Sequence, residues 1–184
     1  MKLRYLSAAA VLIAGVSIQA QAADSANIDF VGNITDSTCD VTIDGGSASK
    51  VITLTDITVP AMKAATSSPA QKASFAISVK NCAASVVAGS KIKGQFSTVG
   101  GYNSTTQALL NTDASGDKDA GFQVEDTATN TIIDFQSAAA QSEADYDDTN
   151  GAVFNYTVGY LYSGTGTPAL GSVKANTTFT TTYP

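Results

Sequence analysis

The longest alternating run of the chain is Phe154-Asn155-Tyr156-Thr157-Val158-Gly159-Tyr160-Leu161-Tyr162. Its large side chains recur at every second residue, which is the period of a β-strand with one buried face. Similar runs occur at residues 28–34, 51–54, 75–79, 92–96, 122–124, 132–135 and 173–183, whereas a helix-like pattern is confined to residues 138–144. Stretches rich in Gly, Ser, Thr, Asn and Asp separate the runs. The sequence therefore predicts an all-β sandwich in a single domain.

The first residues have the pattern of an export signal. Lys2 and Arg4 precede an apolar stretch, and Ala20-Gln21-Ala22 offers small residues where a signal peptidase reads the chain. We predict cleavage before Ala23, so that residues 1–22 are a signal peptide. The apolar stretch is shorter than the roughly 20 residues of a comfortable membrane span, and no later segment approaches that length. We expect the mature chain to be exported and not embedded in a membrane.

Composition argues against several classes of function. The chain has no histidine, and loss of Lys2 and Arg4 with the signal leaves 8 basic residues, all lysines, against 16 acidic ones. Nucleic-acid binding depends on basic side chains that neutralise phosphates, so we expect no nucleic-acid partner. Without histidine no Ser-His-Asp or Cys-His arrangement can form, and no phosphate-cradling glycine loop is present. The sequence predicts neither an enzyme nor a cofactor.

The only two cysteines are Cys39 and Cys82. In an exported chain the oxidising compartment favours a disulfide between them. A free reactive thiol is the alternative. A metal site needs more ligands than this histidine-free chain supplies, so we expect none.

Two other groups of side chains have both a functional and a structural interpretation. The one acidic cluster is Glu143, Asp145, Asp147 and Asp148. A calcium loop or a glycosidase pair needs oxygen ligands or carboxylates at set positions, and a solvated loop fits this spacing better. The tyrosines of the longest run are Tyr156, Tyr160 and Tyr162. They would suit a carbohydrate-binding platform, but strand spacing favours alternation between core and rim.

Both ends of the mature chain are strands for which the sequence offers no partner. The last run continues to Tyr183, and the first begins directly behind the predicted cleavage site. A sheet that lacks a strand exposes backbone donors, acceptors and core side chains, and a free apolar strand complements such an edge. Donation between copies is head-to-tail and builds a fibre. The alternative is that the first run is an ordinary strand of a closed sandwich.

Several segments follow one another in a characteristic order and spacing: Phe30-Val31-Gly32-Asn33-Ile34-Thr35, Cys39-Asp40-Val41, Phe75 to Cys82, Lys93-Gly94-Gln95-Phe96, and Gly171 to Pro184. In this combination the mature chain resembles the chaperone–usher pilins, the subunits of type 1 and related fimbriae. The resemblance implies an all-β, incomplete immunoglobulin-like sandwich that lacks its last strand. A donor strand from another subunit would complete it.

The resemblance also implies a domain division and a set of partners. Residues 23–37 would be the N-terminal donor-strand extension and residues 38–184 the pilin domain. The partners would be neighbouring subunits in a head-to-tail homopolymer, a periplasmic chaperone that lends a strand, and an outer-membrane usher that catalyses the exchange. The chain would pass through the periplasm into a fimbrium on the cell surface, where it would support adhesion.

The site residues carried over from the family lie near both ends of the chain. The donor-strand positions would be Ala26, Ile28, Phe30, Gly32 and Ile34. The last strand would line the acceptor groove and pair with the chaperone through Phe179, Thr181 and Tyr183. Cys39 and Cys82 match the family disulfide. The alternative function is a self-complete secreted β-sandwich that binds a glycan or a protein.

Overall fold

The computed structural model describes residues 39–83, 85–98 and 100–183. The predicted signal peptide and the donor positions from Ala26 to Ile34 lie outside these residues. The described part is all-β with one short helix, which confirms the predicted fold class. Its elements are β1 (Asp40–Ile43), α1 (Val59–Ala64), β2 (Ala70–Lys80), β3 (Lys91–Ser97), β4 (Tyr102–Asn103), β5 (Ala108–Leu110), β6 (Ala120–Asp126), β7 (Thr131–Ile132), β8 (Ser142–Asp145), β9 (Ala152–Tyr162) and β10 (Thr178–Thr182).

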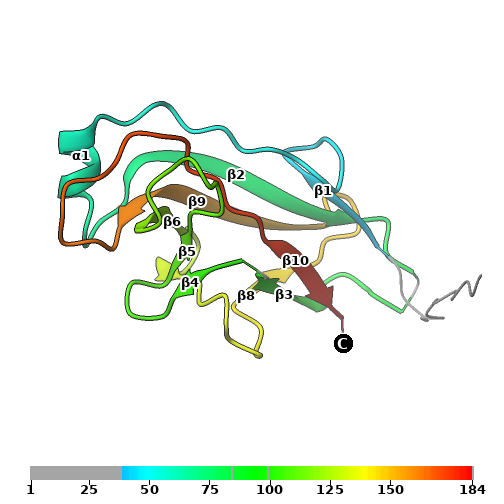
Figure 1. The fold of residues 1–184 in the computed structure, drawn as a ribbon. Coiled ribbons are helices and arrows are strands. Elements are labelled where there is room, and N and C mark those ends of the chain that lie inside the picture. The colour runs from blue at the N-terminus through cyan, green and yellow to red at the C-terminus, as the bar shows by residue number, and fades with distance from the viewer. Residues whose placement is uncertain (1–38, 84, 99, 184) are drawn as a thin grey trace, which may run out of the picture. The chain divides into compact units, whose positions relative to one another are not determined.

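Two antiparallel sheets build the sandwich. The 7-stranded sheet has the order β1-β2-β9-β6-β5-β4 with β7 paired to β6, and the 3-stranded sheet has the order β10-β3-β8. The long strands β2 and β9 lie side by side (Figure 1), with Ile77 opposite Phe154. β9 also pairs with β6 along its other edge. The run with the clearest alternation in the sequence is therefore a central strand of the larger sheet.

The core fills the space between the two sheets. β9 contributes Phe154 and Tyr156, which are 3% and 1% exposed. From β3, Phe96 places its ring centroid 4.9 Å from that of Tyr156, in an edge-on arrangement that aromatic pairs prefer. Because burial of side chains of this size is a large favourable contribution to folding, this aromatic cluster is a main source of cohesion between the sheets.

Two segments predicted as strands have no strand partner in the described structure. Residues 51–54 lie in the connection between β1 and α1, which Figure 1 shows in cyan without an arrow. The last strand is shorter than predicted, because residues 173–177 precede β10 and belong to no strand. Residues 51–54 and 173–176 keep the alternating burial of a strand. Alternation in the sequence therefore predicts which side chains are buried, but it does not predict whether the backbone is hydrogen-bonded to another strand.

The sequence predicted a helical turn in the wrong part of the chain. Residues 138–141 precede β8 and residues 142–144 belong to it; β8 pairs with β3, with Glu143 opposite Lys93. The helix α1 begins instead at Val59, where the Thr58 hydroxyl accepts from the Ala61 N–H at 3.4 Å and a proline occupies the first turn, both common helix-start features. Among the described residues no helix has the length and apolarity needed to cross a membrane.

Candidate functional site

A groove of about 550 Å³ runs along the sandwich. Its apolar lining comes from the inner faces of both sheets and includes Phe75, Ile77, Phe96, Phe122 and Val158. Residues 48–52 and Leu54 border it from one part of the chain, and residues 175–179 border it from another. Among the described residues of the lining, Lys50 is the only charged one, and its Nζ binds Asp44 Oδ2 at 2.6 Å. The groove therefore suits an apolar occupant.

The first border, residues 48–54, lies in the connection between β1 and α1 and packs through its side chains. Ile52 and Leu54 are half-buried and pack against the main core cluster, whereas Val51 is 84% exposed. Among the described residues no backbone–backbone hydrogen bond involves residues 48–57. Buried or half-buried backbone groups normally find partners, so this extended polar edge beside the groove is open to a strand.

The second border is β10 with the residues that precede it. β10 pairs with β3, where Phe179 lies opposite Phe96, and no described strand pairs with its other edge. The Phe179 ring centroid is 4.9 Å from that of Phe96 and 5.3 Å from that of Phe154. Phe179 is only half-buried because its remaining surface faces the groove. β10 is therefore an edge strand with one side free for pairing.

The absence of a side chain at Gly94 leaves the space that the Phe179 ring occupies. A Cβ at Gly94 would lie 2.6 Å from Phe179 Cζ and 3.2 Å from Phe154 Cε1, closer than carbon atoms pack. Within β3, Gly94 stands between the buried residues Ile92 and Phe96 on the same face. In the sequence, a glycine between large residues on the same buried face indicates that another side chain fills the space above it. The sequence does not indicate that this side chain is Phe179, which is distant in the chain.

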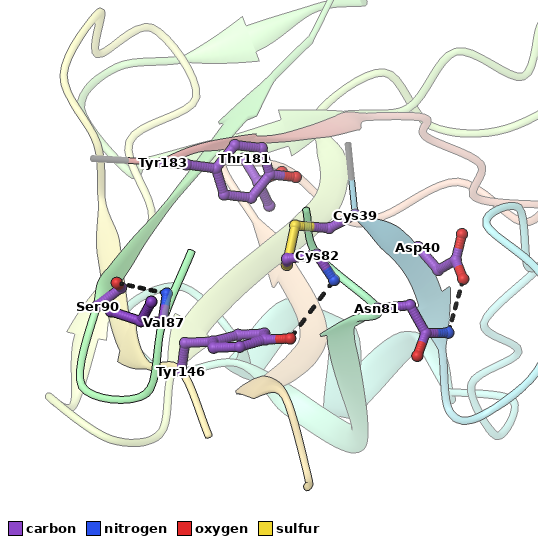
Figure 2. The surroundings of a disulfide bond; sticks show 9 residues. All are labelled: Cys39, Asp40, Asn81, Cys82, Val87, Ser90, Tyr146, Thr181 and Tyr183. Carbon is purple, nitrogen blue, oxygen red and sulfur yellow. Dashed lines mark hydrogen bonds between the residues drawn. A yellow bond between two sulfur atoms is a disulfide. The ribbon is translucent and has the colours of Figure 1, made fainter. Parts of the chain in front are cut away.

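The three residues predicted for the last strand share one face of the chain end. Phe179 enters the groove lining, whereas Thr181 and Tyr183 lie beside the disulfide, as Figure 2 shows. The Thr181 Oγ1 and the Tyr183 hydroxyl are hydrogen-bonded at 2.8 Å. Tyr183 also packs against the main core cluster. The end of the last strand is thus anchored next to the point where the described chain begins.

The structure contains the expected disulfide between Cys39 and Cys82. It joins the residue before β1 to the connection that follows β2. Beside it, Asn81 Nδ2 donates to Asp40 Oδ2 at 2.8 Å, and the Cys82 N–H donates to the Tyr146 hydroxyl at 3.4 Å (Figure 2). The covalent link therefore closes the end of the β1–β2 pair that lies beside Tyr183.

Replacing both cysteines by serine should lower the free energy of unfolding by about 4 kcal/mol, because the link spans 43 residues and restricts the unfolded chain. Denaturant unfolding of the mature chain with and without the two substitutions would measure the loss. Wild-type protein in a reductant is the matched control and should shift by the same amount. Equal unfolding midpoints for the variant and the oxidised wild type would contradict this expectation.

The acidic cluster has a structural role in the described chain. Glu143 and Asp145 of β8 face Lys93 and Lys91 across the strand pair, at 3.7 Å and 2.6 Å. The backbone N–H groups of Asn150 and Thr149 donate to Asp147 and lower the pKa of its carboxyl. Within the described ranges, no group of three or more side chains is placed to hold a metal ion.

The tyrosines of β9 form no exposed platform. Tyr156 and Tyr162 are 1% and 3% exposed and belong to core clusters. Tyr160 is half-buried, with its ring centroid 5.2 Å from that of Phe122. These positions agree with alternation between core and rim.

Comparison with known proteins places the fold. The P pilus rod subunit PapA is 17% identical, with a TM-score of 0.60, and the match covers 79% of this chain and 99% of that one. A chaperone–usher pilus, whose structure addresses rod uncoiling, is 17% identical with a TM-score of 0.59, covering 88% of this chain and 97% of that one. At such identities the likeness concerns the fold, which is the predicted immunoglobulin-like pilin fold. No curated protein sequence matches significantly.

The family is shown by a separate match. The family model described as fimbrial protein matches residues 28–184, which include both borders of the groove and both cysteines. This family is of a structural, non-enzymatic kind. The chain therefore belongs to the fimbrial protein family and is a structural subunit of a pilus.

Proposed function

We propose that this subunit polymerises by donor-strand exchange, with its groove accepting the N-terminal extension of the next subunit. The observation that carries the proposal is the pair of edges, residues 48–54 and β10, that have no strand partner among the described residues and lie on either side of an apolar groove. A single extended segment lying between them would satisfy both edges. It would also cover the half-buried ring of Phe179.

Residues 23–37 have the chemistry that such a groove requires. Ala26, Ile28, Phe30, Gly32 and Ile34 alternate with Asn27, Asp29 and Asn33, so an extended chain would present one apolar face to the groove and one largely polar face to solvent. Main-chain bonds would supply affinity and alternate side chains would supply specificity. The last strand, with Phe179, Thr181 and Tyr183, is the acceptor edge in this proposal.

Export and assembly complete the proposed pathway. Residues 1–22 would direct the chain to the periplasm and be removed there. A chaperone would pair with β10 until an outer-membrane usher replaces its strand by that of the next subunit. A groove left open would expose an unpaired edge and apolar side chains, which promote aggregation. The need for temporary cover supports a chaperone partner and a final location in a surface fimbrium that supports adhesion.

The experiment that tests donation uses residues 38–184 refolded with and without a synthetic peptide of residues 23–37. We expect the peptide to raise the melting temperature strongly after long incubation, because it binds only the folded state. A peptide with Phe30→Asp is the matched control and should give no rise. If the trimmed domain is stable and indifferent to the native peptide, the fold is self-complete and the protein is a binding module.

A further inference from the structure

The segment before β10 is held in place by a side chain that substitutes for a strand. Asn111 follows β5 and is only 5% exposed. Its Oδ1 accepts from the Lys174 N–H at 2.9 Å, and its Nδ2 donates to the Ser172 carbonyl oxygen at 2.9 Å. One residue of a neighbouring parallel strand makes this same pair of bonds, to residues two apart. The Asn111 amide therefore acts as a one-residue strand partner for residues 172–174.

Neighbouring groups of the same loop reinforce this attachment. The Thr112 N–H and hydroxyl both donate to the Lys174 carbonyl oxygen, at 2.8 Å and 3.0 Å. The Asp113 carboxylate binds Lys174 Nζ at 2.7 Å and the Ser172 hydroxyl at 2.6 Å. Lys174, with the Ser172 and Ser115 hydroxyls, holds the pKa of Asp113 far below its usual range. The Asp113 carboxyl therefore stays ionised, and able to bind these groups, at pH values well below those at which a free aspartate is protonated.

These contacts all reach one edge of the segment. Between residues 172 and 176, the backbone groups with described partners belong to Ser172, Lys174 and Asn176. In an extended chain, successive residues direct their N–H and C=O groups to opposite edges. Val173, Ala175 and Thr177 therefore direct theirs to the other edge, and Ala175 and Thr177 line the groove.

The same alternation continues through β10. On β3, the side chain of Gln141 bonds to both the N–H and the carbonyl oxygen of Phe96, at 2.7 Å and 3.2 Å. Phe96 therefore directs its backbone groups away from β10. Its opposite residue Phe179 must in turn direct its own backbone groups away from β3 and toward the free edge. The odd-numbered residues from Val173 to Thr181 thus share one continuous edge.

We infer that Asn111 is a positioning residue for strand acceptance, because it aligns residues 173–177 with β10 and so extends the acceptor edge beyond the five residues of that strand. This inference rests on the proposed function. It assigns to the groove a pairing edge about twice the length of the strand that the free subunit forms. Without the Asn111 amide, residues 172–174 lose the two hydrogen bonds that stand in for pairing with a neighbouring strand.

The test uses the mature chain with Phe30→Asp, which cannot donate its own strand, mixed with a labelled peptide of residues 23–37. We expect peptide uptake to protect the amide hydrogens of Val173, Ala175 and Thr177 from exchange, as well as that of Phe179. Adding Asn111→Ala should slow uptake about tenfold, since it removes two bonds to this segment, and should confine protection to Phe179 and Thr181. Before peptide is added, the Lys174 amide should exchange faster while β2 and β9 remain protected.

Two further variants separate positioning from general destabilisation. Asn103→Ala removes an asparagine whose Oδ1 accepts from two backbone N–H groups outside the groove, and it should leave uptake unchanged. Thr112→Val removes one hydroxyl bond to the Lys174 carbonyl and should slow uptake less than Asn111→Ala does. Equal uptake and equal protection with and without Asn111→Ala would overturn the inference alone. Absence of uptake by every variant would overturn the proposed function and this inference with it.

Discussion

Gly94→Val should abolish strand acceptance while the sandwich remains folded. The new side chain would overlap the rings of Phe179 and Phe154. Phe154 is 3% exposed and has no room to move, whereas Phe179 borders the groove and can turn into it. The displaced ring would then occupy the space that the donor strand needs. Overpacking of this kind costs about 1–3 kcal/mol, and valine favours strands, so we expect β3 to persist.

The measurement is the yield of surface fibres when Gly94→Val is the only subunit in the cell, together with the circular dichroism of the purified protein. Gly166→Val is the matched control, because a Cβ at Gly166 has nothing within 4 Å. The control should give normal fibres. Gly94→Ala should give an intermediate yield, since it adds a single carbon. Full-length fibres from Gly94→Val would contradict the claim that a side chain at residue 94 displaces the Phe179 ring into the groove.

Phe30→Asp should also abolish polymerisation, but by disrupting the donor strand while leaving the acceptor groove intact. In the proposed donation the side chain of residue 30 enters a groove whose lining includes Phe96 and Val158. Transfer of an ionised carboxylate into such surroundings costs several kcal/mol or more without a partner. Val31→Asp is the matched control, because residue 31 falls on the opposite face of the same extended segment. It should polymerise, and capture of Phe30→Asp by the chaperone should be normal.

A mixture of the two variants provides a second readout for the donor prediction. Gly94→Val keeps its donor segment, and Phe30→Asp keeps its groove, so one of each can join. The resulting pair has a blocked groove at one end and a spoiled donor at the other. Size measurement after mixing should show dimers and nothing longer. Long fibres from this mixture, or from Phe30→Asp alone, would rule out the assigned donor strand.

The elements that the sequence predicts well are those whose pairing and burial coincide. β9 carries a large side chain at every second residue and is paired on both edges, so its alternation and its hydrogen bonds point to the same structure. Residues 51–54 alternate equally clearly but pair with no strand in the described part of the chain. Alternation indicates which face of a segment is buried, but it does not indicate whether a neighbouring strand is present to pair with its backbone. Residues 51–54, which border the groove, were therefore predicted as an ordinary strand.

The candidate site divides in a similar way. Alternation placed Phe179 in the last run of the chain, because apolar burial leaves a pattern, whereas its role in the acceptor groove was implied only by the family resemblance. Asn111 was not predictable, since its partner Ser172 is 61 residues away and a buried amide leaves no periodic signal. α1 escaped detection because it is six residues long, which is too short for a helical period to emerge.

The disulfide between Cys39 and Cys82 has a mechanical consequence for the proposed fibre. Tension on the extension of a subunit would arrive at Cys39 and meet the covalent link before it meets β1, a strand of only four residues. The link passes the load to the end of β2, whose 11 residues lie between β1 and β9. Load applied along a strand is shared by its hydrogen bonds, instead of breaking them one after another. The joint between subunits is thereby anchored in a long strand that is paired on both edges.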